Sequence, residues 1–297
     1  MSPIEGSLVA LITPMDDQGA INFSDLDKLV DFHLENNTNG LVVLGTTGEA
    51  ATIDDTEREA IIQQVVARVA GKIPVIIGTG HNDTKKALKL TQEAMQLGAD
   101  AALVVTPYYN KPSQAGLIAH YKAIASNVDI PIILYNVPGR TACDMLPDTV
   151  AELINSDLKN IVGLKEAVGN QERINHLAKL CSDDFALLSG DDETYVNLLR
   201  AGGHGTISVT ANIAPKIISE VCRLAKLGDW TECDLLNNKL RLLHKDLFVS
   251  ANPMPIKWAM YHLGLISTPQ CRLPLLPLES KYFETLKTAL NHADMLK

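Results

Sequence analysis

Residues 101–135 read AALVVTPYYNKPSQAGLIAHYKAIASNVDIPIILY, and this stretch contains the unit from which the fold is built. Its two ends, 101–105 and 131–135, are short apolar runs of the kind found in strands that are buried on both faces. Residues 114–126 between them have the amphipathic pattern of a helix. A strand, a helix and a second strand in this order predict a βαβ unit with parallel strands.

The same alternation extends in both directions from this stretch. Eight apolar runs are predicted to be strands: 8–13, 40–44, 74–77, 101–105, 131–135, 161–165, 186–188 and 205–209. Helical patterns follow them at 23–35, 55–70, 83–97, 114–126, 147–154, 171–180, 193–201 and 215–227. Eight such units in about 225 residues predict an α/β fold of the closed (β/α)8 type, the TIM barrel. The rival fold, a doubly wound open sheet, would need a nucleotide fingerprint, and the sequence contains no G-x-G-x-x-G motif.

The pattern changes after residue 215. Helical segments at 215–227, 230–247, 254–263 and 279–291 succeed one another with no strand between them. The first of them can serve as the eighth helix of the barrel. We therefore predict a catalytic barrel over residues 1–225 and a small C-terminal helical domain over residues 226–297.

Composition argues against several classes of function. The chain has 297 residues with 26 Lys and Arg against 35 Asp and Glu, and its net charge of −9 makes nucleic acid and anionic membranes poor partners. Its apolar stretches all fall short of the ~18 residues that a membrane span needs. Five widely spaced cysteines favour reduced thiols, and residues 1–5 lack the basic start of a signal peptide, so we expect a cytoplasmic protein.

Chemistry in such a barrel is expected where the strands end, because the active sites of these folds lie at that face. Lys165 closes the apolar run 161–165, where a charge is expensive to bury. If Leu164 packs outward, Lys165 points into the mouth of the barrel, and loss of water there favours the neutral, nucleophilic amine. The alternative is a lysine at a strand end that simply extends into solvent.

Three further positions have a functional and a structural interpretation. Tyr135 closes the neighbouring strand and could carry protons to a group bound at Lys165, or it could be a core tyrosine. Thr46 and Thr47 could grip a carboxylate, and the same turn could serve as a helix cap. Arg140 follows a Pro-Gly turn and suits a carboxylate, although a solvated loop arginine is the alternative.

Other polar groups do not indicate chemistry. Asp191, Asp192 and Glu193 are explained by capping of the next helix, so we assign them no catalytic role. The eight histidines have no spacing typical of metal ligands, and we predict neither a metal ion nor a cofactor.

Four motifs, in chain order at the ends of four predicted strands, together resemble the dihydrodipicolinate synthase family, within the pyruvate-dependent class I aldolases. The motifs are GTTGE at 45–49, YYNKP at 108–112, YNVPGRT at 135–141 and GLKEA at 163–167. The likeness extends from Gly6 to about His292. It implies an enzyme of lysine and diaminopimelate biosynthesis that joins pyruvate to L-aspartate 4-semialdehyde through a Schiff base on Lys165.

The resemblance also implies roles for the other residues. Tyr135, Thr46 and Tyr109 match the family's proton relay, and in that family the tyrosine matching Tyr109 reaches into a neighbouring subunit. Thr47 matches the residue that holds the carboxylate of pyruvate, and Arg140 matches the one that binds the semialdehyde. Positions lining the pyruvate site are matched by Gly190 and Ile207. The family is usually a homotetramer, a dimer of dimers.

Related aldolases that act on sugar acids remain an alternative. Those lyases usually have Ser-Thr where this chain has Thr46-Thr47, and they lack an arginine that matches Arg140, so both features favour the synthase. A barrel without catalysis and a pyridoxal phosphate barrel are further alternatives. The first predicts no covalent adduct with pyruvate, and the second predicts cofactor absorbance.

The resemblance further suggests weak feedback inhibition by lysine. Tyr108, Asn82 and Ala51 match positions that line the lysine pocket of inhibited family members. Arg58 stands where those members often carry histidine, Asp55 occupies another such position, and Lys86 replaces a glutamate that faces the effector. A fixed cation repels the ammonium group of lysine, so we expect weak or absent inhibition.

Overall fold

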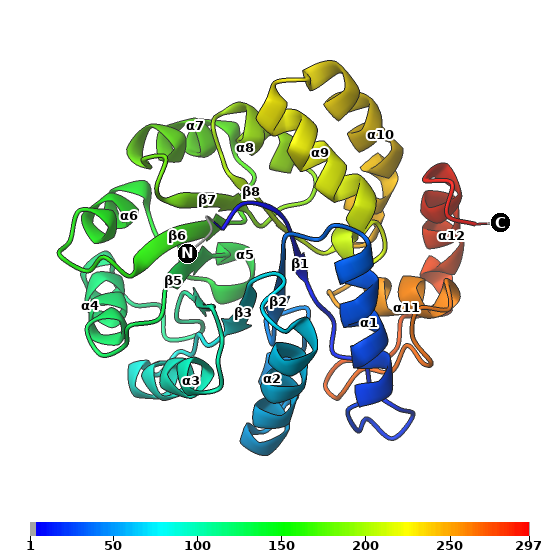
Figure 1. The fold of residues 1–297 in the computed structure, drawn as a ribbon, viewed down its shortest axis with the longest axis horizontal. Coiled ribbons are helices and arrows are strands. Elements are labelled where there is room, and N and C mark those ends of the chain that lie inside the picture. Colours follow the sequence, from blue (N-terminus) through cyan, green and yellow to red (C-terminus); the bar gives the residue numbers. More distant parts are fainter. Residues whose placement is uncertain (1–3, 297) are drawn as a thin grey trace.

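Eight parallel strands form a closed barrel in the computed structural model, which describes residues 4–296 (Figure 1). The strands are β1 (Gly6–Ala10), β2 (Gly40–Val43), β3 (Val75–Gly78), β4 (Ala101–Val105), β5 (Ile132–Asn136), β6 (Ile161–Glu166), β7 (Ala186–Ser189) and β8 (Gly205–Ser208). Each strand pairs with the next, and β8 pairs with β1 to close the sheet. The predicted (β/α)8 barrel is therefore confirmed. Residues 1–3 of the N-terminal segment considered above lie outside the described residues.

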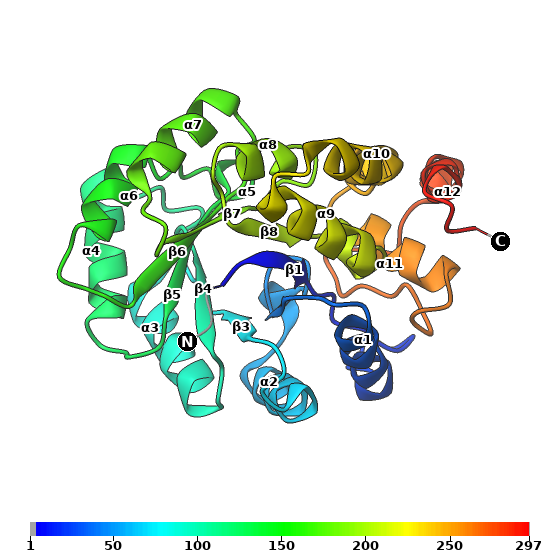
Figure 2. The same ribbon diagram turned by 45° about the horizontal axis from the view of Figure 1, so that its top comes forward.

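Helices cover the outside of this barrel (Figures 1 and 2). They are α1 (Phe23–Glu35), α2 (Asp55–Val69), α3 (Thr84–Gln96), α4 (Gln114–Ala125), α6 (Pro147–Ile154), α7 (Gln171–Leu180), α8 (Tyr195–Arg200) and α9 (Pro215–Leu227). Four of the predicted ranges, 23–35, 147–154, 171–180 and 215–227, agree with the structure at both ends. A short helix that the sequence pattern did not predict, α5 (Pro138–Thr141), follows β5.

The first strand is the clearest difference from prediction. The apolar run 8–13 predicted a strand there, but β1 ends at Ala10. Leu11 and Ile12 remain buried, and the Ile12 amide donates a hydrogen bond to the side chain of Asn212 instead of to a strand. The run is therefore apolar because it is buried beyond the strand end, and burial alone does not extend a sheet.

The strands are apolar on both faces because each face packs against a different layer. Inside the barrel, Leu8, Val42, Ile76 and Leu188 belong to one cluster of buried side chains. The alternate residues face outward and pack against the helices, as Leu164 does in a second cluster. This arrangement explains the continuous runs of Val, Ile and Leu in the sequence.

Three helices follow the barrel: α10 (Trp230–Asp246), α11 (Met254–His262) and α12 (Phe283–His292), with short 3-10 turns at Ala50–Thr52, Thr210–Asn212 and Ser280–Tyr282. α10 lies beside α9, and α12 lies against α10 and α11, on the opposite side of the molecule from α4 and α6 (Figures 1 and 2). Trp258 stacks between His262 and Phe283, with ring centroids 4.8 and 4.7 Å away. The division into domains at residues 225 and 226 stays a prediction, since buried residues of α10–α12 share one cluster with those of α1 and α9.

Candidate active site

Lys165 and Tyr135 lie side by side at the carboxyl ends of two neighbouring strands. They are paired across β5 and β6, and the Lys165 ammonium lies 4.4 Å from the centre of the Tyr135 ring. Both side chains are buried, with 6% and 7% of their surface exposed. Because Leu164 packs outward against the helices, Lys165 lies on the inner side of β6 rather than extending into solvent.

Gly190, which follows β7, leaves room for the Lys165 side chain. A Cβ atom added at Gly190 would lie 2.7 Å from Cε of Lys165 and 3.0 Å from its Cγ. Ile207 lies in β8, is 1% exposed and belongs to the cluster inside the barrel. The structure therefore places Gly190 directly against Lys165. Ile207 lies among the residues that fill the barrel.

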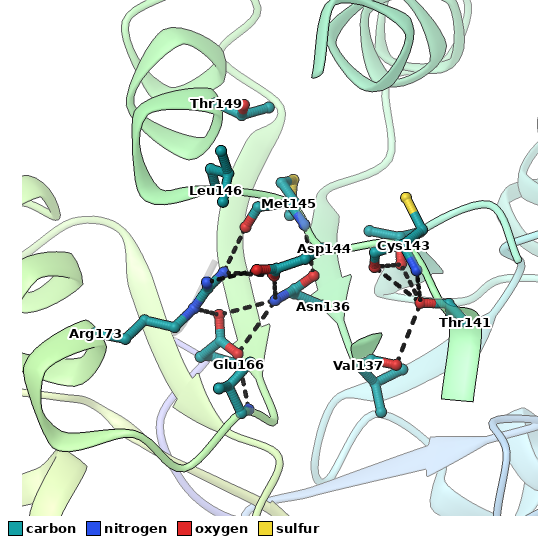
Figure 3. Close-up of polar contacts among 12 residues, drawn as sticks. Asn136, Val137, Thr141, Cys143, Asp144, Met145, Leu146, Thr149, Glu166 and Arg173 are labelled. Carbon is teal, nitrogen blue, oxygen red and sulfur yellow. Dashed lines mark hydrogen bonds and ion pairs between the residues drawn. The ribbon is translucent and has the colours of Figure 1, made fainter. Parts of the chain in front are cut away.

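A buried polar network lies on the same two strands as Lys165 and Tyr135, and Figure 3 shows its side chains. Its members are the residues that follow them, Glu166 and Asn136. The Asn136 amide donates to both oxygens of Glu166, at 3.3 and 3.2 Å. Arg173 donates to Glu166 over 2.8 Å, and the Val168 amide donates to the same carboxylate over 2.8 Å. The two strands are therefore bonded to each other directly beneath Tyr135 and Lys165.

The electrostatics of this network centre on Glu166. Burial raises the pKa of its carboxyl group, and the attraction and hydrogen bond of Arg173 oppose that effect. Side-chain exposure is 1% for Glu166 and 11% for Arg173, so water screens this ion pair little. Sequence analysis missed both residues. Two features of the sequence could have revealed this pair. Glu166 places a charge at the outward position after Lys165, and Arg173 is a basic residue in the first turn of the next helix.

The segment that carries Arg140 is tied to the same network. Arg140 is exposed on α5, and the chain then passes through Cys143 and Asp144. Asp144 accepts a hydrogen bond from Asn136 at 2.9 Å and one from Arg173 at 3.1 Å (Figure 3). The Arg140 side chain itself makes no hydrogen bond or ion pair among the described residues. The network therefore holds the loop in place and leaves the Arg140 guanidinium available to a ligand.

The β2–α2 loop holds both predicted threonines. Thr46 is exposed, whereas Thr47 is 3% exposed and its hydroxyl oxygen accepts a hydrogen bond from the Asn252 amide at 2.9 Å. The sequence analysis assigned no role to Asn252, because this residue lies 205 positions after Thr47 in the chain. The buried Glu49 carboxylate forms an ion pair with Lys257, which is also buried.

Tyr109 is not brought together with the other candidates in this single chain. Its side chain is 88% exposed, and its backbone has a φ of 75°, in the left-handed region. Such a conformation is uncommon for a bulky residue, and so is such exposure of a large aromatic ring.

The capping role predicted for the acidic run after Gly190 is not seen, because α8 begins at Tyr195 and no side chain caps its first turn. Asp191 accepts a hydrogen bond from the amide of Thr194, just before α8. Asp192 is buried and instead accepts hydrogen bonds from the amides of Val209 and Thr210, at 3.0 and 2.8 Å. The prediction was wrong for Asp192 because its carboxylate faces the loop after β8 rather than the start of the next helix.

Within residues 4–296, no group of three or more His, Cys, Asp or Glu side chains is placed to hold a metal ion. Over the same residues, none of the helices combines the length and the apolar character needed to cross a membrane.

Comparison with known proteins identifies close relatives of this chain. The profile of the dihydrodipicolinate synthetase family matches residues 3–293. A 4-hydroxy-tetrahydrodipicolinate synthase of Pseudomonas savastanoi pv. phaseolicola is 52% identical over 293 residues, covering 99% of each chain. A chloride-inhibited dihydrodipicolinate synthase of Acinetobacter baumannii, solved in complex with pyruvate, has a TM-score of 0.96 and 49% identity, and the match covers 99% of this chain and 100% of that one. A relative from Cyanidioschyzon merolae, solved with lysine bound, has a TM-score of 0.94 and 37% identity, and the match covers 99% and 100%.

Proposed function

Because this chain belongs to the dihydrodipicolinate synthetase family, we propose that its reaction takes place on Lys165 at the mouth of the barrel. The enzyme is a lyase that joins pyruvate to L-aspartate 4-semialdehyde and forms 4-hydroxy-tetrahydrodipicolinate. The observation that supports the assignment best is the position of Lys165, buried against the Tyr135 ring with Gly190 beside its side chain. A lysine in that position is suited to attack a ketone as the nucleophile of a Schiff-base enzyme.

The proposed reaction has four stages, all of them on the Lys165 amine. The Lys165 amine attacks the ketone carbon of pyruvate, and loss of water leaves a cationic Schiff base. This cation withdraws electrons, so the methyl carbon releases a proton and an enamine forms. The enamine carbon then attacks the aldehyde carbon of the semialdehyde, which makes the new carbon–carbon bond, restores the cationic Schiff base and leaves an oxyanion that takes up the proton released from the methyl carbon. Finally, the amino group of the second substrate attacks the imine carbon, so the ring closes and Lys165 is released.

The remaining candidates supply proton transfer and substrate binding in this proposal. Tyr135 carries protons to and from the group bound on Lys165, relayed through Thr46 and Tyr109. The Thr47 hydroxyl donates to the carboxylate of pyruvate. Arg140 binds the carboxylate of the semialdehyde, and its exposed guanidinium, which has no partner within residues 4–296, supports that role. The lining of the pyruvate site is completed by Gly190 and Ile207.

We further propose that the enzyme is a homotetramer built as a dimer of dimers, and that it works in the cytoplasm. Tyr109 supports the first part, because an aromatic side chain that is 88% exposed in one subunit is suited to enter the site of another. The five cysteines support the second, since all are free thiols and four are buried.

Trapping with borohydride tests the central assignment. Reduction of the protein in the presence of pyruvate should add the mass of one reduced adduct, and peptide mapping should locate it on Lys165. Lys165→Ala should abolish the adduct and nearly all turnover while the barrel still unfolds at a similar temperature. An adduct on another lysine, or turnover retained by Lys165→Ala, would contradict the proposal.

A further inference from the structure

Asn252 makes a direct contact from the C-terminal part of the chain to the threonine proposed to hold pyruvate. Its amide nitrogen lies 2.9 Å from the hydroxyl oxygen of Thr47 and donates a hydrogen bond to it. Asn252 is 5% exposed and Thr47 is 3% exposed, so water does not compete for this bond. The contact joins the loop after β2 to the residues just before α11.

The same C-terminal segment holds the loop at a second point. Lys257, in the first turn of α11, forms a buried ion pair with Glu49 and donates to the carbonyl of Gln270 at 2.8 Å. The other oxygen of the Glu49 carboxylate accepts a hydrogen bond from the amide of Arg272 at 3.0 Å. The Lys257 and Glu49 charges balance each other, and each group has a further hydrogen bond. These contacts fix the loop backbone next to Thr47.

The direction of the Asn252 hydrogen bond matters for Thr47. A threonine hydroxyl has one proton to donate and two lone pairs that accept. Since Asn252 donates to it, one lone pair is occupied and the proton points away from Asn252. Among the described residues no group accepts this proton. The hydroxyl is therefore preset as a donor, which is what binding of an anion requires.

We infer that Asn252 is a positioning residue, which orients the Thr47 hydroxyl so that it donates to the carboxylate of pyruvate. The inference rests on the proposed function, in which Thr47 holds that carboxylate. It gives the C-terminal helical region a part in substrate binding, although none of its side chains needs to touch the substrate. Asn252 acts through Thr47, and its effect should be confined to pyruvate.

The test measures the pyruvate concentration that gives half-maximal borohydride trapping on Lys165, with pyruvate as the sole ligand. Asn252→Asp keeps the shape of the side chain but replaces the donor with a negatively charged acceptor, so the Thr47 proton turns toward it. We expect half-saturation to rise tenfold or more. Asn252→Ala removes the orienting bond without reversing it and should raise half-saturation about threefold. The KM for the semialdehyde at saturating pyruvate should stay within about twofold of the starting value.

A double-mutant cycle with Thr47→Val distinguishes positioning from general damage to the fold. In a Thr47→Val background, Asn252→Ala should change half-saturation by less than about twofold, since its effect passes through the hydroxyl. Equal effects in both backgrounds would overturn the inference, and so would an Asn252→Asp variant that binds pyruvate like the starting protein. If Asn252→Asp does not fold, the double-mutant cycle with Asn252→Ala still shows whether Asn252 acts through Thr47.

Asn160→Asp is the matched control. The Asn160 amide donates to the carbonyls of Ala125 and Val128, at 3.0 and 2.9 Å, just before β6 begins at the other end of the barrel. The same chemical change there should lower the melting temperature and leave pyruvate half-saturation unchanged. If the unsubstituted protein forms no adduct on Lys165, the proposed function itself is wrong, and this inference falls with it.

Discussion

The Lys165 ammonium lies 4.4 Å from the centre of the Tyr135 ring, and the two residues are paired across β5 and β6. This distance fits a cation–π contact, in which the ring face attracts the charged amine. The ring and the hydroxyl of Tyr135 therefore have separable functions. The ring packs against the lysine, while the hydroxyl is the part that can move a proton.

Tyr135→Phe should separate these two functions. The ring contact remains, so Lys165 should stay in place and still be trapped by borohydride with pyruvate. Loss of the hydroxyl should lower kcat by about 10²–10⁴-fold, the usual contribution of a general acid–base group. Steady-state kinetics and trapping of the same preparation check this. A variant with full turnover would show that another group carries the proton.

Gly190→Ala should disturb Lys165 directly. The added methyl group would lie 2.7 Å from Cε of Lys165, so the side chain has to move. A shift of the reacting amine by about 1 Å can cost about 10²-fold in rate, and we expect kcat to fall by that order. Gly116→Ala in the outer helix α4 is the control, because its methyl group would meet Pro112 and Ser113 rather than the lysine. Similar kinetics for both variants would contradict the prediction.

Arg140→Ala should weaken use of the semialdehyde far more than binding of pyruvate. The guanidinium has no partner within the described residues, so its removal disrupts no contact of the fold. Loss of a charge-assisted bond to a carboxylate should raise the KM of the semialdehyde about tenfold or more. Pyruvate half-saturation in the trapping assay provides the comparison. Equal losses for both substrates would argue against the assigned role.

Arg173→Met should destabilise the protein by about 3–5 kcal/mol, because it leaves the Glu166 carboxylate buried without its cation. Lys122→Met provides a surface control. Lys122 pairs with Glu152, and both side chains are well exposed, so less than about 1 kcal/mol should be lost. Urea unfolding at pH 7 measures both. Adding Glu166→Gln to Arg173→Met should restore part of the loss, since it removes the unpaired charge.

The same carboxyl group predicts a pH dependence. Burial raises the pKa of Glu166 in the folded chain above the value of 4.5 that applies when it is exposed. The contribution of this group to stability is therefore fully present below pH 4.5 and is lost as the pH rises through the folded pKa. Without Arg173, burial is opposed only by the hydrogen bonds from Val168 and Asn136, so in Arg173→Met the loss should be larger and extend to higher pH. Unfolding curves between pH 4 and 8 check this, and curves parallel to those of the starting protein would refute it.

L-lysine should inhibit this enzyme weakly. Tyr108 packs edge-on against His81 at 5.9 Å, and burial followed by the nearby Lys86 charge lowers the pKa of His81. Arg58 is buried and its guanidinium donates to the carbonyl of Gly78, which limits its movement. We expect Lys86→Glu to increase inhibition at least tenfold by replacing repulsion with attraction. An inhibition constant below 1 mM for the unsubstituted enzyme would contradict this prediction.

Local patterns predicted the barrel because each strand is buried on two faces and each helix on one. They placed Lys165 on the inner side of β6, since alternation along a strand needs no knowledge of distant residues. They failed where a contact joins distant parts of the chain. Asn252 and Thr47 are 205 positions apart, and no periodicity relates them. The short helix α5 was missed for another reason, because its four residues are too few to show a helical repeat.

The Glu49–Lys257 ion pair has a consequence for synthesis of the chain. Its partners are separated by 208 residues, so Glu49 leaves the ribosome long before Lys257 is made. In the finished fold both side chains are sealed from water, and a buried carboxylate without its cation is strongly unfavourable. Until Asn252 and Lys257 have been made, the turn around Thr47 lacks both of its contacts with the C-terminal segment. We therefore expect the proposed pyruvate site to stay incomplete until the final helices emerge, so that catalysis begins only after translation is finished.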